Sequence, residues 1–275
     1  MSIEIPGAGA SDIGLCRYAG SKLACRGPMR PLDGPYVAFI GGTETFGRFV
    51  TVPFAEQVER VTGRTCVNLG AAHSGVDAWL TDPALTGVAA GAETVLIQLP
   101  GAQTLSNRYY RVHPRRNDRF LAPEPPLAEL FPEVDFTDFT FVNHMLSALN
   151  AVSVERFSLV RNAVQELWSE RMPDLIRRFR TPPILLWLRY DSVALNRGCA
   201  ALGSNPVFVE GTMVDRLRPI AGPVVALDLT TASVAHELKK MRFGPMQAPA
   251  AAQMPGPSAH KAVAKALLEI IEPAE

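Results

Sequence analysis

Short apolar runs that end close to glycine or proline recur along the chain. Each run is apolar at successive positions, which is typical of a strand that is buried on both faces. The sequence therefore predicts strands at residues 36–40, 65–69, 94–99, 184–188 and 224–229.

Between these runs, apolar residues recur at helical spacing. A first stripe predicts a helix over 53–63, with proline in its first turn and glycine at its end. A longer stripe covers 160–179, where Pro173 either kinks the helix or starts a new one. A last stripe predicts a C-terminal helix up to Ile271, with Ser258 as its N-cap.

The alternation of strands and helices indicates a fold class. Right-handed crossovers between such strands produce a mostly parallel sheet that helices cover on both faces. We expect an α/β protein, a three-layer flavodoxin-like sandwich with a central, mostly parallel five-stranded sheet. Residues 1–35 are expected to form an irregular N-terminal arm and 36–275 a single domain. A long loop or helical insertion is expected at about 101–158, since this segment is too long for a simple connector.

Composition excludes several classes of partner. The 275 residues carry a net charge of zero and no recognised reader motif, so duplex nucleic acid is not an expected partner. No apolar run approaches the ~18 residues of a membrane span. The N-terminus lacks a secretory pattern. The four scattered cysteines, Cys16, Cys25, Cys66 and Cys199, are expected to be free thiols. We therefore expect a cytoplasmic protein without a membrane partner. No cluster has metal-ligand spacing, so neither a metal nor another cofactor is expected.

Polar and glycine residues directly follow the predicted strands, where ligands bind in parallel sheets. The segments are Gly-Gly-Thr-Glu-Thr-Phe-Gly at 41–47, Asn-Leu-Gly at 68–70 and Gly-Ala-Gln-Thr at 101–104. Near the C-terminus, Pro-Ser-Ala-His at 257–260 opens the last predicted helix.

These segments resemble, in order and spacing over residues 36–272, the conserved blocks of the SGNH or GDSL hydrolases. The resemblance implies an SGNH-hydrolase-like fold and places Thr43 where the family has its nucleophilic serine. It places His260 at the general base, and Gly70 and Gln103 at the oxyanion donors. Each block departs from the family pattern, and Pro257 replaces the aspartate that orients the histidine. We also expect the chain to belong to an alphaproteobacterial branch that resembles this fold, which implies no reaction.

Each proposed catalytic position has a chemical reason. A hydroxyl nucleophile needs a neutral base, and a helix N-terminus disfavours the charged form of His260. Backbone amides and an amide side chain suit a developing oxyanion. The alternatives stay open: Gly41 and Gly42 can simply end a strand, and His260 can be a core histidine. For the separate histidines His73 and His236, surface or capping roles are favoured.

The segment 106–120 interleaves arginine with tyrosine directly after the third strand block. Guanidinium groups suit phosphate, sulfate or carboxylate, and tyrosine adds stacking faces. The expected ligand-binding residues are Glu44, Asn107, Arg108, Tyr110, Arg111, His113, Arg115 and Arg116. Alternatively, the arginines pair with the acidic stretch at 124–138, within the chain or across a homodimer.

Three functions follow from these features. The leading one is a divergent SGNH-like esterase or acyl transferase that acts on an anionic or glycosylated small molecule. The second is a non-catalytic pseudo-hydrolase that binds an anionic ligand, such as a phosphate, sulfate or carboxylate. The third is an oligomeric assembly protein.

Overall fold

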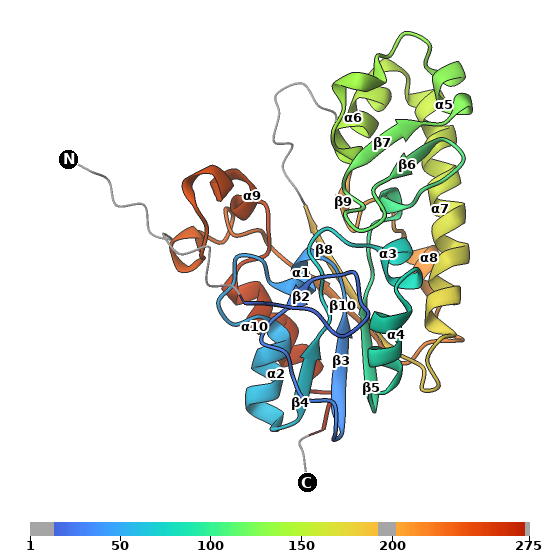
Figure 1. Ribbon diagram of the computed structural model, residues 1–275. Helices are drawn as coiled ribbons and strands as arrows, with labels where there is room; N and C mark the ends of the chain where they lie inside the picture. The colour runs from blue at the N-terminus through green and yellow to red at the C-terminus, as the bar shows by residue number, and fades with distance from the viewer. Residues whose placement is uncertain (1–13, 192–201, 273–275) are drawn as a thin grey trace, which may run out of the picture.

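A mostly parallel central sheet organises the molecule (Figure 1). The computed structural model describes residues 14–191 and 202–272. The sheet has six strands, and its order is β10-β8-β5-β3-β4 with β9 paired to β8. The parallel strands are β3 (Tyr36–Ile40), β4 (Thr65–Asn68), β5 (Thr94–Gln98), β8 (Ile184–Asp191) and β10 (Val224–Asp228).

All five expected strands are therefore confirmed, but the expected strand count is corrected. The sixth strand, β9 (Ser204–Asn205), pairs antiparallel with the end of β8. It has two residues, neither of them apolar, so the hydrophobic pattern that revealed the other strands could not reveal this one.

Helices cover both faces of the sheet. On one face, α2 (Phe54–Thr62) and α10 (Pro257–Leu267) pack against Val37 and Phe39 of β3. On the other face, Ala38 and Ile40 of β3 join a larger apolar cluster. The helices on that side are α3 (Val76–Leu80), α4 (Pro83–Ala90), α7 (Val154–Ile176) and α8 (Gly211–Asp215). Successive side chains of a strand point to opposite faces, which explains why the expected runs are apolar throughout.

The structure decides two details of the predicted helices. Pro173 lies inside α7, which continues to Ile176, so no new helix starts there. Helix α10 has Gly256, not Ser258, as its N-cap, and Pro257 occupies its first position. Ser258 instead donates from its hydroxyl to Glu237 Oε2, at 2.6 Å.

The expected insertion is an ordered part of the domain. It contains a hairpin of β6 (Tyr110–Val112) and β7 (Phe120–Pro123), and the helices α5 (Pro125–Leu130) and α6 (Val142–Val152). Short 3₁₀ turns lie at Ala102–Thr104 and Phe136–Asp138. Its apolar side chains, including Tyr110, Leu127 and Phe131, belong to the same cluster as the sheet. The insertion therefore packs as an extension of the core.

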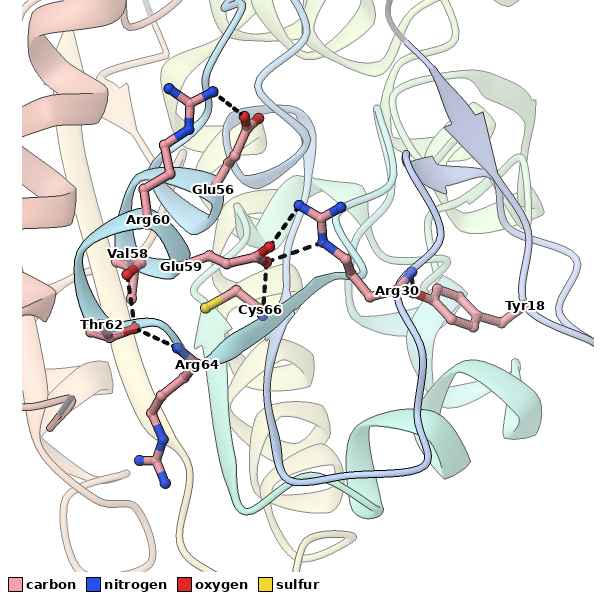
Figure 2. Close-up of polar contacts among 9 residues, drawn as sticks. All are labelled: Tyr18, Arg30, Glu56, Val58, Glu59, Arg60, Thr62, Arg64 and Cys66. Atoms are coloured by element: carbon pink, nitrogen blue, oxygen red, sulfur yellow. Dashed lines mark hydrogen bonds and ion pairs between the residues drawn. The ribbon is translucent and has the colours of Figure 1, made fainter. Parts of the chain in front are cut away.

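The N-terminal arm is fastened to the sheet. Its first residues lie outside the described part, and from Gly14 onward it forms a short pairing of β1 (Leu15–Cys16) with β2 (Cys25–Arg26). Arg30 forms an ion pair with Glu59 of α2, and Glu59 also accepts a hydrogen bond from the amide of Cys66 in β4 (Figure 2). One carboxylate thus joins the arm, a helix and an edge strand.

Part of the C-terminal third packs beside the segment that follows β3. The 3₁₀ turns Leu238–Lys240 and Pro245–Gln247 and the helix α9 (Ala248–Ala252) pack with Phe49 in a small apolar cluster. The amide of Arg242 donates to the carbonyl of Phe49, at 2.9 Å. This contact brings Arg242 close to the segment that follows β3.

Two further expectations concern thiols and membranes. Cys16, Cys25 and Cys66 are free thiols, as expected, and Cys199 lies outside the described residues. Within 14–191 and 202–272, no helix has the length and apolar character that crossing a membrane requires.

Candidate anion-binding pocket

A pocket of about 570 Å³ lies beside the segments that follow β3 and β4. It is formed by parts of the chain that are distant in sequence: the arm, the residues after α1 (Thr43–Phe46), the loop 71–73, the segment 113–116 and the C-terminal third. Its permanently charged lining residues are Arg17, Lys22, Arg48, Arg115, Arg116 and Arg242. Of the described residues, no aspartate or glutamate lines this pocket.

The rest of the lining is largely apolar. Leu15, Leu23, Phe46 and Phe49 provide the larger apolar surfaces. The combination of several cations with an apolar wall suits a ligand that has an anionic group on an apolar body.

Two pocket-lining side chains, Arg48 and His73, form a polar chain with Asp118, which is not itself a lining residue. His73 Nε2 lies 2.5 Å from Arg48 Nη1, and His73 Nδ1 lies 3.2 Å from Asp118 Oδ2. A guanidinium can only donate hydrogen bonds, so Nε2 must be the acceptor in the first contact. The single ring proton of neutral His73 is therefore on Nδ1, where it is donated to Asp118.

The electrostatic surroundings keep His73 neutral. Burial, together with Arg48, Arg116 and Arg119, lowers the pKa of His73 to about 4. Burial raises the pKa of Asp118 although the same arginines oppose this shift. Both effects follow from the cost of holding a charge away from water.

The backbone at His73 adopts an unusual conformation. Its φ of 64° lies in the left-handed region, which non-glycine residues seldom adopt. Its amide donates to Thr43 Oγ1 at 2.9 Å, and its carbonyl accepts from the amide of Asn117 at 2.9 Å. Contacts from two other segments thus hold the loop in place.

Glu44 belongs to a second polar cluster at the carboxyl ends of the strands. Gln98 Oε1 accepts from the amides of Gly42 and Thr45 and from the Thr45 hydroxyl. Gln98 Nε2 donates to Glu44 Oε2 at 2.7 Å, and the Tyr190 hydroxyl donates to Glu44 Oε1. Burial raises the pKa of Tyr190, and the Glu44 charge adds to this effect. Glu44 therefore links α1 to β5 and β8.

The residues expected at a hydrolase site form hydrogen bonds with other partners rather than with one another. Thr43 Oγ1 accepts from His73, as described above. The Gly70 amide donates to Asn68 Oδ1 at 2.9 Å, and Gln103 Nε2 donates to Asn143 Oδ1 at 3.3 Å.

His260 lies on the helix face that packs against α2. Its side chain is almost fully buried, and its Nδ1 accepts from the amide of Phe54 at 3.2 Å. The two rings also stack, with centroids 5.5 Å apart. Burial, with Arg26 nearby, lowers the pKa of His260 to about 3. This geometry is that of a core histidine, the alternative considered for this residue.

The expected ligand-binding residues divide into two groups. His113, Arg115 and Arg116 line the pocket. The others are not among its lining residues: besides Glu44, these are Asn107, Arg108, Tyr110 and Arg111.

Apart from Glu44, the second group has structural contacts in and next to the β6–β7 hairpin. Asn107 Oδ1 accepts from the Tyr109 amide, and the Arg108 guanidinium lies over the Tyr109 ring. The buried Tyr110 hydroxyl donates to the Gln103 carbonyl at 2.8 Å. Arg111 forms an ion pair with Glu124, which is the expected pairing with the acidic stretch, here within the chain.

Sequence reasoning missed several pocket residues. Arg17, Lys22 and Arg242 come from segments without a recognisable motif, and only the fold brings them together. Surface or capping roles are favoured for His73 by the sequence, and the structure shows a side chain that is 25% exposed and pairs with Asp118. The positions of Arg48 and His73, shortly after the strands β3 and β4, are the available signals.

A comparison with known families places the whole chain in a family. The model of a domain of unknown function, DUF6473, matches residues 1–275, the whole chain. A comparison with curated proteins gave no match. Among residues 14–191 and 202–272, no group of three or more histidine, cysteine, aspartate or glutamate side chains is arranged to hold a metal ion.

Proposed function

The chain belongs to the DUF6473 family, and we propose that it binds a small anionic molecule, or a glycan that carries an anionic group, in the basic pocket. The observation that carries this proposal is the lining itself. Six permanently charged cations face one pocket, and among the described residues no carboxylate lines it. Like charges gathered at a pocket repel one another, and an anion relieves that repulsion.

Matched pairs of arginines test the proposal. Arg115 and Arg116 line the pocket, whereas Arg108 and Arg111 come from the same segment but do not. The variant Arg115→Gln/Arg116→Gln removes the same charge as the control Arg108→Gln/Arg111→Gln. Calorimetry with phenyl phosphate and phenyl sulfate is the measurement.

We expect the pocket variant to bind at least about tenfold more weakly, since a charge-assisted hydrogen bond contributes ~1.5–3 kcal/mol. The control variant is expected to stay within about twofold of the wild type, because long-range effects of exposed charges are screened by salt. Equal weakening in both variants would mean that net charge, not this pocket, governs binding.

We also infer a finer description of the fold. Numbered along the chain, the parallel strands lie in the order 2-1-3-4-5. This order is that of flavodoxin-like sheets. Together with the glycine-rich segment 41–47 after the first parallel strand, it supports a relationship to the SGNH or GDSL hydrolases.

Ester hydrolysis or acyl transfer stays a prediction for this chain. The position of Thr43 after β3 favours it. The observed contact of His260, the expected base, is a hydrogen bond from the Phe54 amide to its Nδ1, which does not favour it. Hydrolysis of p-nitrophenyl acetate that is lost in Thr43→Val would support this activity. Hydrolysis that is unchanged in Thr43→Val would count against Thr43 as nucleophile.

Assembly through the arginine-rich segment also stays a prediction. The pairing of Arg111 with Glu124 uses part of that segment within one chain. Sedimentation at low and high salt, with Arg108→Glu as a charge-reversal variant, tests whether the exposed remainder joins two copies.

A further inference from the structure

We infer that the pocket selects a phosphate monoester over a sulfate ester of the same shape, and that His73 is the residue that makes this distinction. The inference rests on the proposed anion binding and names the class of ligand. Its basis is the hydrogen-bonding direction of His73 Nε2, which the structure defines.

Asp118 and Arg48 together determine that direction. Asp118 holds the ring proton on Nδ1, since Nδ1 and Oδ2 are 3.2 Å apart. Nε2 is then a hydrogen-bond acceptor, and it faces Arg48, which lines the same pocket as His73. The acceptor is therefore located among cations that attract an anion.

A bound anion changes the partner of this acceptor. Anionic oxygens form stronger hydrogen bonds with a guanidinium than a neutral imidazole does. We expect an oxygen of the ligand to replace Nε2 as the acceptor of the hydrogen bond from Arg48 and to lie beside Nε2. Nε2 and an ionised ligand oxygen are both hydrogen-bond acceptors, so their lone pairs repel each other. A proton between the two atoms turns this repulsion into a hydrogen bond.

The two ester classes differ in their ability to provide that proton. A phosphate monoester has a second pKa of about 6, so near neutral pH it is mostly a dianion, but a modest stabilisation is enough to protonate it. A sulfate monoester is fully ionised and carries none. One proton shared between Nε2 and the phosphate oxygen gives a hydrogen bond that the sulfate ester lacks.

The charged groups around His73 couple ligand binding to the uptake of this proton. Arg48 and Asp118 contact the ring, and the charges of Arg116 and Arg119 also act on it. Burial and the arginines keep the ring neutral when the pocket holds no anion, and a phosphate dianion opposes the field of the arginines. Above the second pKa of the ligand, binding is therefore accompanied by uptake of a proton.

The local backbone supports a functional role for His73. A non-glycine residue with φ of 64° is strained, and contacts with Thr43 and Asn117 hold it there. Such strain gathers at functional sites. The apolar wall with Phe46 and Phe49 suits the body of an aryl or alkyl phosphate.

Calorimetry with phenyl phosphate and phenyl sulfate at pH 7.5 tests the inference, in two buffers of different ionisation enthalpy. His73→Asn removes the ring but tolerates a positive φ. His236→Asn is the matched control, since His236 is an exposed histidine that also has a positive φ, 54°.

For the wild type and the control, we expect phenyl phosphate to bind at least about tenfold more tightly than phenyl sulfate, with uptake of close to one proton. A hydrogen bond to a charged group is large enough for this ratio. In His73→Asn, the two affinities are expected to converge to within about threefold, and the proton uptake to disappear.

Several outcomes would overturn the inference. Equal affinities in the wild type would leave anion binding intact but remove the selection of phosphate. A phosphate preference without proton uptake, or one that persists in His73→Asn, would exclude His73 as its cause. Binding of neither ligand would overturn the anion-binding function as well. If His73→Asn does not fold, the affinity ratio of the wild type decides, since it must decrease as the pH rises from 6.5 to 9.

Discussion

His260 and Phe54 are joined twice, by a hydrogen bond of 3.2 Å from the Phe54 amide to Nδ1 and by stacking of the two rings. The amide belongs to the first turn of α2, where backbone donors have no partner within the helix. A residue of α10 thus completes the start of α2, and the pairing links the two helices on one face of the sheet.

Replacing His260 tests this structural role. His260→Ala is expected to lower the free energy of unfolding by about 2–4 kcal/mol, since it leaves a cavity and an unpaired buried amide. His260→Gln, whose side-chain oxygen can accept from the amide, is expected to lose less. Urea denaturation gives both values, and an unchanged stability in His260→Ala would contradict the role.

The same residue predicts a dependence of stability on pH. Its pKa is 6.5 when exposed and about 3 in the fold, so between these values the unfolded chain holds a proton that the folded chain lacks. Stability therefore decreases as the pH falls from about 6.5 towards 3, by about 1.4 kcal/mol per unit from this residue. The difference between wild type and His260→Gln, measured from pH 7 to pH 4, isolates this contribution. Parallel pH profiles would contradict it.

Arg26 is expected to stabilise the segment after α1. Its buried guanidinium donates to the carbonyls of Gly47, Val50 and Thr51, at 3.0, 3.2 and 2.9 Å. Arg26→Met leaves these carbonyls without their donor and should lower stability by about 3 kcal/mol or more. Arg60→Met, which removes an exposed ion pair with Glu56, should cost at most about 1 kcal/mol. Similar losses in the two variants would contradict the assigned role.

Gly70 is expected to be required for close packing. A Cβ at this position would lie 2.4 Å from the Phe46 amide nitrogen and 2.7 Å from the Thr45 carbonyl carbon. Because both neighbours are backbone atoms, Gly70→Ala should destabilise the fold by about 2–3 kcal/mol. Gly87→Ala is the control: its Cβ meets nothing within 4 Å, and alanine favours helix α4. Thermal melting distinguishes the two, and a neutral Gly70→Ala would show that α1 can move.

The amide group of Gln98 is expected to be required for full stability of the fold. In Gln98→Glu, a carboxylate oxygen replaces the nitrogen that donates to Glu44. The two carboxylates repel each other unless one takes up a proton, so the variant should be less stable than wild type at pH 8 and recover part of the difference at pH 5. Unfolding by urea at both pH values is the measurement. A loss that does not depend on pH would contradict the expected repulsion.

A second substitution provides the control for Gln98. In Glu44→Gln/Gln98→Glu, the amide and the carboxylate exchange places, and Tyr190 can still donate to residue 44. The double variant is expected to regain about 1 kcal/mol or more relative to Gln98→Glu alone. Absence of any recovery would show that the loss of stability in Gln98→Glu comes mainly from the contacts of Gln98 with Gly42 and Thr45.

The sequence alone determined the five parallel strands, the helices α2, α7 and α10, and the residues at the carboxyl edge of the sheet. These features depend on local patterns: a run that is apolar at every position can be accommodated only between two covering layers. The short strands β1, β2, β6, β7 and β9 were not predicted, because two to four residues do not form such a run. The sequence also identified the arginine-rich segment, but not which of its arginines share a pocket.

Only the tertiary structure decided the partners of the polar groups. A histidine that begins a helix can serve as a base or accept a buried amide, and only the fold shows that His260 Nδ1 accepts the amide of Phe54. His73, Asp118 and Arg48 likewise come from three separate segments. Their spacing in the sequence does not indicate that they are in contact. Hydrogen bonds and charges act over a few ångströms in space, so their partners follow from the packing of the chain rather than from the order of its residues.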